Sequence, residues 1–383
     1  MRAILRLSVA FALAALSVGV PGAVAVGAQP AAAITCQIVP FDPSSNFTGD
    51  HMMHDIDALA TNDIWAVGEQ DGDSGVPLAY HYNGHKWKRS SLAPAQPGWP
   101  YAVLNAVAAR ATNDVWAFGV EVDTSNTHMQ LPIEHWNGHH WTFSSSFVIP
   151  GADDTYELDV NGAVAISARD AWVVGESPGQ PPFAYHWNGI AWSNTTLPDG
   201  VGYLSDVTGS AAHGVWAIGG DLPNQSILHW DGSAWQTAYG LNDDLGILNR
   251  MDITKSGNVV AVGNADNKRQ QVALAGPSPS WVSQVVPPTK YDYTQLLDVA
   301  VVSAKSIWAI GETSPHQFIQ PRYPAVYRWN GSKWSQLTMP INKNAGEILE
   351  AMTSVPGSNQ VYAVGYVDYG PYVSKDLLIT RIC

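Results

Sequence analysis

NDIWAVG, residues 62–68, recurs along this chain as an aromatic residue, apolar residues and a closing glycine. Four close copies follow: NDVWAFG (113–119), RDAWVVG (169–175), HGVWAIG (213–219) and KSIWAIG (305–311). Two divergent copies, GNVVAVG (257–263) and NQVYAVG (359–365), bring the number to seven. The closing glycines lie 44 to 56 residues apart, a period that is typical of a β-propeller rather than a helical solenoid.

Each repeat predicts four short strands. An apolar segment such as LSDVTG (204–209) predicts the innermost strand, and the recurring phrase itself predicts the second. A third segment, such as SILHWDG (226–232), ends in Asp-Gly or Asn-Gly, which indicates a tight hairpin before a fourth strand that opens with tryptophan. The sequence therefore predicts an all-β, seven-bladed β-propeller of four-stranded blades.

The last repeat supplies three strands only. ITCQIVP (34–40) has the spacing of the fourth strands WSNTTLP (192–198) and WSQLTMP (334–340). We therefore expect N- and C-terminal strands to share the last blade and close the ring. A disulfide between Cys36 and Cys383 would hold that closure and remove roughly 4 to 5 kcal/mol of unfolded-state entropy; two unpaired thiols are the alternative.

Residues 1–33 have the features of a signal peptide. Arg2 and Arg6 precede an apolar run over residues 7–20, and small residues offer cleavage after Ala25, Ala28 or Ala33. The run is short for a bilayer span. We therefore expect no membrane insertion and a secreted, extracellular or cell-surface protein. Residues 34–383 are expected to form a single propeller domain that is a monomer.

Charge and cysteine use exclude some classes of function. The formal net charge is -14 and no cluster of Lys or Arg is present, so nucleic acid is a poor partner. The copper site of an oxidase on a kelch-like propeller needs a cysteine–tyrosine crosslink, whereas both cysteines lie near the ends of the mature chain. Neither a cofactor nor a metal is expected.

The phrase order D-V-W-A-V-G, then H-W-N-G, then a spaced tryptophan resembles kelch-like repeats. It is more similar to the propellers of secreted actinobacterial proteins, and more distantly to tectonin-type lectin repeats. Only Gly219-Gly220 has the double glycine that kelch repeats carry. The resemblance covers residues 34–383 and implies the fold, but not the activity, because propellers host lectins, hydrolases, lyases and scaffolds.

Four histidines occupy one position of the third strand, and arginine stands there in two other repeats. The histidines are His81, His135, His186 and His229, and the arginines are Arg328 and Arg381. A metal ligand would not alternate with arginine. We therefore interpret the position as one of packing and hydrogen bonding.

A better candidate site lies at the channel mouth, where propellers commonly bind ligands. Counting back eleven residues from the repeat tryptophan, or its equivalent, gives one residue per innermost strand; the last repeat needs a one-residue insertion. The positions are His54, Asn105, Asn161, Ser205, Asn249, Leu297 and Glu350. The six polar ones form our candidate ligand-binding set, because amides, an imidazole and a carboxylate suit hydroxyl groups.

Two functions fit this sequence. The first is a secreted module that binds glycans or extracellular proteins at the channel mouth or rim loops, without catalysis. The second is a propeller-fold glycoside hydrolase or polysaccharide lyase, in which Glu350 would act with Asp55, Asp206 or Asp298. Such an enzyme needs two carboxyl groups about 5 to 10 Å apart.

Overall fold

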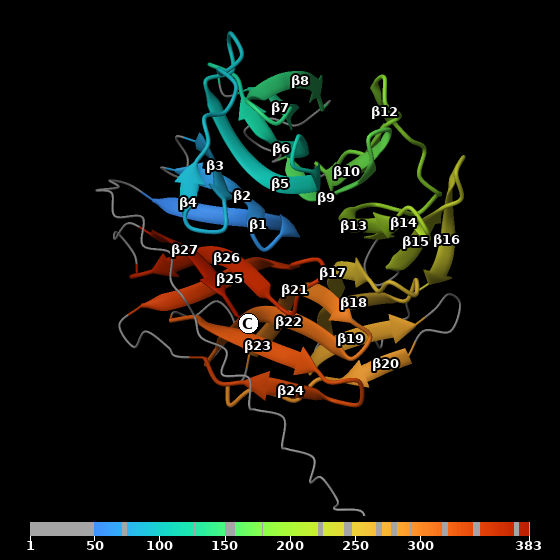
Figure 1. Ribbon diagram of the computed structural model, residues 1–383. Coiled ribbons are helices and arrows are strands. Elements are labelled where there is room, and N and C mark those ends of the chain that lie inside the picture. Colours follow the sequence, from blue (N-terminus) through green and yellow to red (C-terminus); the bar gives the residue numbers. More distant parts are fainter. Residues whose placement is uncertain are drawn as a thin grey trace, which may run out of the picture. The chain divides into compact units, whose positions relative to one another are not determined.

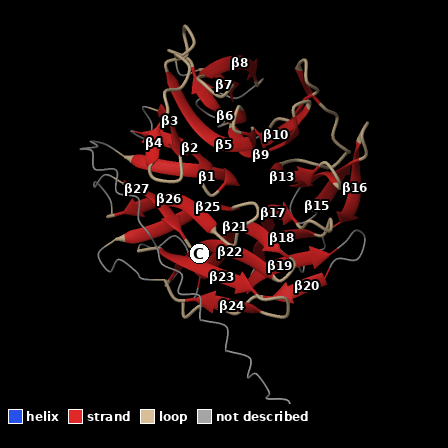
Figure 2. Ribbon diagram, viewed as in Figure 1, coloured by secondary structure: helices blue, strands red, loops and turns tan. Residues whose placement is uncertain are grey.

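The computed structural model describes residues 50–70, 75–125, 127–149, 158–177, 179–220, 225–240, 247–265, 270–276, 282–291, 293–315, 321–339, 345–370 and 375–382. These residues belong to one compact unit, Cys36–Cys383. They form strands and loops (Figure 2), and no helix among them is long and apolar enough to cross a membrane. Cys36, Cys383 and residues 1–33 lie outside the described part, so the disulfide and the signal peptide stay predictions.

Every repeat folds into antiparallel strands in the expected order. The innermost strands are β1 (His51–Ala60), β5 (Tyr101–Ala111), β9 (Asp159–Ser167), β13 (Leu204–Ser210), β17 (Ile247–Ile253), β21 (Tyr293–Ser303) and β25 (Gly346–Ser354). The second strands are β2 (Asp63–Gln70), β6 (Asp114–Val122), β10 (Asp170–Glu176), β14 (Gly214–Gly219), β18 (Val259–Ala265), β22 (Ser306–Ser314) and β26 (Val361–Asp368). The third strands are β3 (Val76–Tyr82), β7 (Met129–Trp136), β11 (Phe183–Trp187), β15 (Ser226–Trp230), β19 (Gln270–Gly276), β23 (Tyr323–Trp329) and β27 (Asp376–Arg381). The fourth strands are β4 (Trp87–Arg89), β8 (Trp141–Val148), β12 (Trp192–Asn194), β16 (Trp235–Gly240), β20 (Val282–Val285) and β24 (Trp334–Leu337).

The sheets surround a central axis as in a β-propeller (Figure 1). Each innermost strand contacts the innermost strands on either side, and β25 contacts β1. The expectation of seven four-stranded blades needs correction, because the described residues form six such blades and a remaining sheet, β25-β26-β27, of three strands. The segment expected to complete that sheet, residues 34–40, lies outside the described residues.

The hydrophobic core lies between the sheets rather than within one layer. Side chains of adjacent sheets form each buried cluster; one of them joins β1, β2 and β3 to the three-stranded sheet through residues such as Met53 and Ile379. The repeat tryptophan packs edge-to-face on the tryptophan that opens the fourth strand of the next blade, with centroids 5.3 Å apart for Trp65 and Trp141 and 5.2 Å for Trp116 and Trp192. These contacts explain why both tryptophans recur.

The third-strand histidines are packing residues, as expected. His81 stacks on Trp65 at 4.3 Å, and its Nε2 lies 2.8 Å from Oδ1 of Asp63. His135 and His186 repeat this arrangement with their own tryptophan and aspartate. Arg328 instead lies over Trp308, so a cation–π contact replaces the stacked imidazole.

Candidate functional site

Each innermost strand contains a β-bulge, and the bulged residue is the one that the spacing selected. In β1 the ladder with β2 pairs Met53 with Gly68 and Asp55 with Val67, which leaves His54 without an opposite residue. The same interruption occurs at Asn105, Asn161, Ser205, Asn249, Leu297 and Glu350. A bulge turns its side chain out of the regular alternation between faces, so the seven strands present these positions to the channel.

The closing glycine of each repeat accommodates this bulge. At Gly119 an added Cβ would lie 1.8 Å from the carbonyl oxygen of Val103, and at Gly263 it would lie 1.9 Å from that of Ile247. The other five repeat glycines have a neighbouring carbonyl oxygen within 2.5 Å of the same position. The recurring glycine is therefore a steric requirement of the bulged innermost strand, because the two backbones approach too closely for a side chain.

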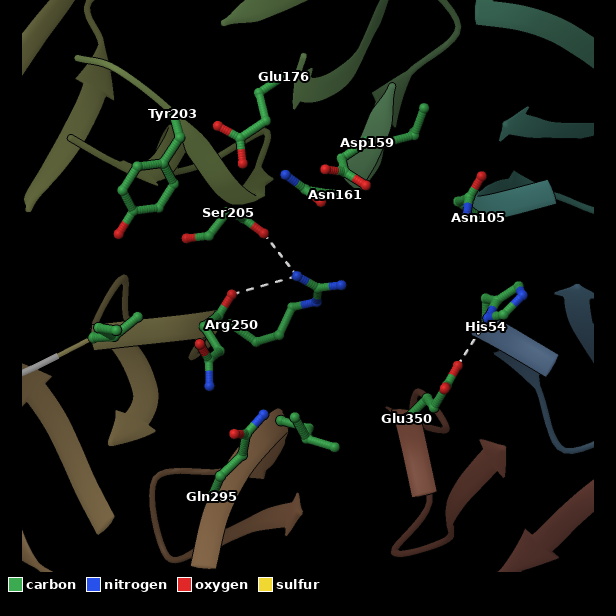
Figure 3. Close-up of a pocket in the computed structure, with 14 residues that line it drawn as sticks. His54, Asn105, Asp159, Asn161, Glu176, Tyr203, Ser205, Arg250, Gln295 and Glu350 are labelled. Atoms are coloured by element: carbon green, nitrogen blue, oxygen red, sulfur yellow. Dashed lines mark hydrogen bonds and ion pairs between the residues drawn. The ribbon is translucent and has the colours of Figure 1, made fainter. Parts of the chain in front are cut away.

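All seven bulged residues line one cavity of about 470 Å³, here called the mouth cavity (Figure 3). The structure thus brings the whole candidate set together, including Glu350, whose position depended on the assumed insertion. Leu297 is the apolar member of the set. A cavity of this size with convergent polar groups is typical of a small-molecule site.

Several bulged side chains are partly engaged by the adjacent blade. Asn161 donates its amide N–H to the carbonyl oxygen of Leu204 at 2.7 Å, and Asn249 donates to that of Leu296 at 2.6 Å. The Ser205 hydroxyl donates to Leu248 O at 3.3 Å. Asn105 differs, since its Oδ1 is buried and has no hydrogen-bond partner among the described residues. The Asn105 oxygen is therefore not tied to the adjacent blade within the described residues.

His54 lies between two carboxylates from different strands. Its Nδ1 is 2.8 Å from Oε2 of Glu350, and its Nε2 is 3.7 Å from Oε1 of Glu69 on β2. Burial alone would lower the pKa of His54, but the bonds to Glu350 and Glu69 outweigh it and raise the pKa to about 10. His54 is therefore an imidazolium at neutral pH, and it lies between the Glu350 and Glu69 side chains at the cavity wall.

Five further polar residues of the cavity wall lie outside the ligand-binding set that the sequence predicted. They are Asp159, Glu176, Tyr203, Arg250 and Gln295. Glu176 alone has a recognisable signal, because glutamate follows the repeat glycine in three repeats, at Glu69, Glu176 and Glu312. Burial, and then repulsion from its strand partner Asp159, raises the pKa of Glu176 to about 7. Of the three carboxyl groups that line the cavity, those of Asp159, Glu176 and Glu350, the Glu176 group can therefore hold a proton near neutral pH.

The aspartates that we expected to act with Glu350 lie elsewhere. Asp55, Asp206 and Asp298 line a second cavity of about 270 Å³, further along the innermost strands. Each accepts a backbone N–H from the next innermost strand; for Asp206 the donor is Met251 N at 2.7 Å. These carboxylates link neighbouring blades, and none of the three lines the mouth cavity.

Comparisons with known proteins support the fold alone. No protein-family model and no curated protein matches the chain. Among solved structures, YCF48 bound to a D1 peptide is 13% identical, with a TM-score of 0.57 and coverage of 91% of this chain and 95% of that one. A GH74 xyloglucanase from Xanthomonas campestris is 13% identical, with a TM-score of 0.58 and coverage of 89% and 55%. A virginiamycin B lyase from Staphylococcus aureus is 8% identical, with a TM-score of 0.57 and coverage of 91% and 99%. The chain is a β-propeller, and the kelch-like and actinobacterial resemblance stays a prediction.

Proposed function

We propose that this protein binds a carbohydrate in the mouth cavity. The observation that carries the proposal is the convergence of seven bulged residues, one from each innermost strand, on a single cavity. Among the six polar ones are three amides, a hydroxyl, a carboxylate and an imidazolium, which together offer donors and acceptors around a closed circle. Sugar hydroxyls need both kinds of partner at many angles, and a ring of strands supplies them.

The size and lining of the mouth cavity are compatible with one or two sugar units. Its volume of about 470 Å³ falls in the range of small-molecule pockets, roughly 300 to 1,000 Å³. Tyr203 adds an aromatic surface to the wall, and Gln295 adds a further amide. An extracellular protein remains the alternative ligand, and it would reach the same cavity with a polar side chain or a chain end.

The experiment is a glycan array followed by isothermal titration calorimetry on the variant Asn105→Ala. Since the Asn105 Oδ1 has no partner among the described residues, the substitution removes a ligand contact without breaking an internal hydrogen bond. We expect a loss of affinity of about tenfold, as for one hydrogen bond, with an unchanged unfolding temperature. The exposed amide of Gln336 on β24 provides the control, and Gln336→Ala should bind as the parent does.

An array without binding above background would contradict the proposal and direct attention to a protein ligand. Binding that survives Asn105→Ala undiminished would place the sugar outside the mouth cavity.

Glycoside hydrolysis or elimination is the second candidate function, favoured by the different surroundings of two carboxyl groups of the cavity, those of Glu176 and Glu350. Glu176, with a pKa of about 7, can hold a proton, whereas Glu350 is paired with the His54 imidazolium. A glycosidase uses one carboxylic acid and one carboxylate in this way. Any polysaccharide hydrolysis or lyase activity should fall at least a hundredfold in both Glu176→Gln and Glu350→Gln, as measured by release of reducing ends or of unsaturated products.

The proposal places the protein outside the cell. This extracellular location is proposed from the sequence of residues 1–33. The closure of the three-stranded sheet by residues 34–40 is also proposed from the sequence alone. One described contact is compatible with that closure, because His51 N donates to Lys375 O at 3.0 Å and so ties the start of β1 to the segment before β27.

A further inference from the structure

Arg250 reaches from β17 into the centre of the mouth cavity. Figure 3 shows its guanidinium in the middle of the ring of labelled side chains, with Ser205 and Asn161 on one side and Gln295 and His54 on others. Arg250 also lines the second cavity. The guanidinium therefore lies at the junction of the two cavities, where a ligand that enters the mouth would meet it.

The hydrogen bonds of Arg250 use only part of its guanidinium. Nη1 donates to the carbonyl oxygen of Ser205 at 2.7 Å and, more weakly, to that of Asn249 at 3.4 Å. Neither Nε nor Nη2 donates to any residue in the described part of the chain. These two atoms form one edge of the planar fork, which matches the two oxygens of a carboxylate.

The surrounding charges leave that edge available. Asp55, Asp206 and Asp298 each feel the charge of Arg250, but each is bound to a backbone N–H of the next blade. No ion pair within 4.0 Å joins Arg250 to a carboxylate of the described residues. The second cation of the mouth cavity, His54, is held between Glu350 and Glu69. Arg250 is therefore the cation of the mouth cavity that can donate hydrogen bonds to a ligand.

We propose that Arg250 binds the carboxylate of an acidic sugar, a uronic acid, through its Nε and Nη2 atoms. This inference rests on the proposed carbohydrate binding and specifies the class of sugar. The carboxylate would lie on Arg250 while the hydroxyls of the same ring meet Asn105 and the other bulged residues. The protonated form of Glu176, which lines the same cavity, can donate to a hydroxyl of the sugar.

The test compares sugars that differ only at C6. Titration calorimetry is performed with D-glucuronate and D-galacturonate, and with D-glucose and D-galactose, on the full chain. We expect the two uronates to bind about tenfold or more tightly than their neutral counterparts. Arg250→Lys keeps the charge but lacks the planar fork, and it should reduce this preference below about threefold.

Two further variants complete the design. Arg250→Gln should abolish the preference, with the unfolding temperature measured alongside so that Arg250→Lys replaces it if the glutamine variant is unfolded. Arg89→Lys, on the outer strand β4, should keep the preference of the parent. Equal binding of acidic and neutral sugars by the parent chain would overturn this inference and leave carbohydrate binding intact. A uronate preference that survives both Arg250 variants would also overturn it, whereas binding of neither kind would overturn the proposed function itself.

Discussion

The glycine that closes each repeat has its effect at the scale of single atoms. It lies beneath the bulged innermost strand, at a distance that leaves no room for even one carbon. The sequence shows that this glycine recurs, and only the structure shows that it is needed for close approach and not for an unusual backbone angle. The same bulge that requires the glycine places the neighbouring polar side chain in the channel, so scaffold and site depend on one residue.

Replacing such a glycine should destabilise the protein strongly. In Gly119→Ala the new Cβ would lie 1.8 Å from Val103 O, a backbone atom that cannot rotate away. We expect the free energy of unfolding to fall by about 3 kcal/mol, measured by urea denaturation. Gly240→Ala is the control, because no heavy atom lies within 4 Å of the added carbon. Equal stabilities of the two variants would contradict the steric explanation.

Inner-strand aspartates act at the scale of elements, where they connect one strand to the next. Asp252 accepts the backbone N–H of Ile253 on its own strand at 2.6 Å and that of Val301 on β21 at 2.7 Å. Asp57 does the same between β1 and β5. Within the described residues no backbone ladder joins one blade to the next, so these carboxylates provide polar links that a sheet would otherwise supply.

Loss of one such link should be costly. Asp252→Ala leaves the part-buried N–H of Val301 without its acceptor, and we expect the free energy of unfolding to fall by about 1 to 3 kcal/mol. Asp199 is exposed and outside the strands, so Asp199→Ala should change stability by less than about 0.5 kcal/mol. Hydrogen exchange at Val301 would locate the effect, and unchanged protection there would argue against the link.

Strand order and the site were predictable to different degrees. The repeats predicted the order of strands and the bulged positions, because each copy must satisfy the same local packing. Glu176, Asp159, Tyr203, Arg250 and Gln295 were not predictable as a group. They come from different positions of the repeat and meet only because the blades surround one axis.

Buried carboxyl groups determine how stability of the whole molecule responds to pH. Burial raises the pKa of Asp57 and Asp206 to about 7 and that of Asp55 and Asp252 to about 6. Such a group binds its proton more tightly in the folded protein than in the unfolded chain. It therefore does not lower the free energy of unfolding below its ordinary pKa of 3.8, and it lowers this free energy progressively as the pH rises to its pKa in the folded protein. The favourable contribution of His54 is complete below 6.5 and is lost as the pH rises towards 10.

Both effects have the same sign, so the free energy of unfolding should decrease from about pH 4, near the ordinary pKa of the aspartates, to about pH 10, the pKa of His54 in the folded protein. Below about pH 4 the free energy of unfolding should also decrease. The bonds to His135 and Arg110 outweigh burial and lower the pKa of Asp114, so its favourable contribution is lost when it is protonated. Urea unfolding at a series of pH values would measure the profile. A maximum on the alkaline side would show that the aspartates are ionised in the folded state.

Closure of the chain is also a property of the whole molecule. If Cys36 and Cys383 are joined, reduction should lower stability by roughly 4 to 5 kcal/mol in the loop-entropy model. Thermal unfolding with and without reductant measures the effect, with Cys36→Ser as the variant that reductant should not change further. Identical melting of the parent chain under both conditions would exclude the disulfide.

The sequence by itself determined that this protein is a β-propeller, that a tryptophan opens most of the fourth strands, and which position of each innermost strand faces the channel. This was possible because every repeat has the same strands and the same packing requirements, so equivalent positions can be compared across the seven copies. Only the tertiary structure decided what the mouth cavity contains, namely the His54–Glu350 pair, the proton-bearing Glu176 and the central Arg250. These properties arise between blades, from distances and burial that no single repeat encodes.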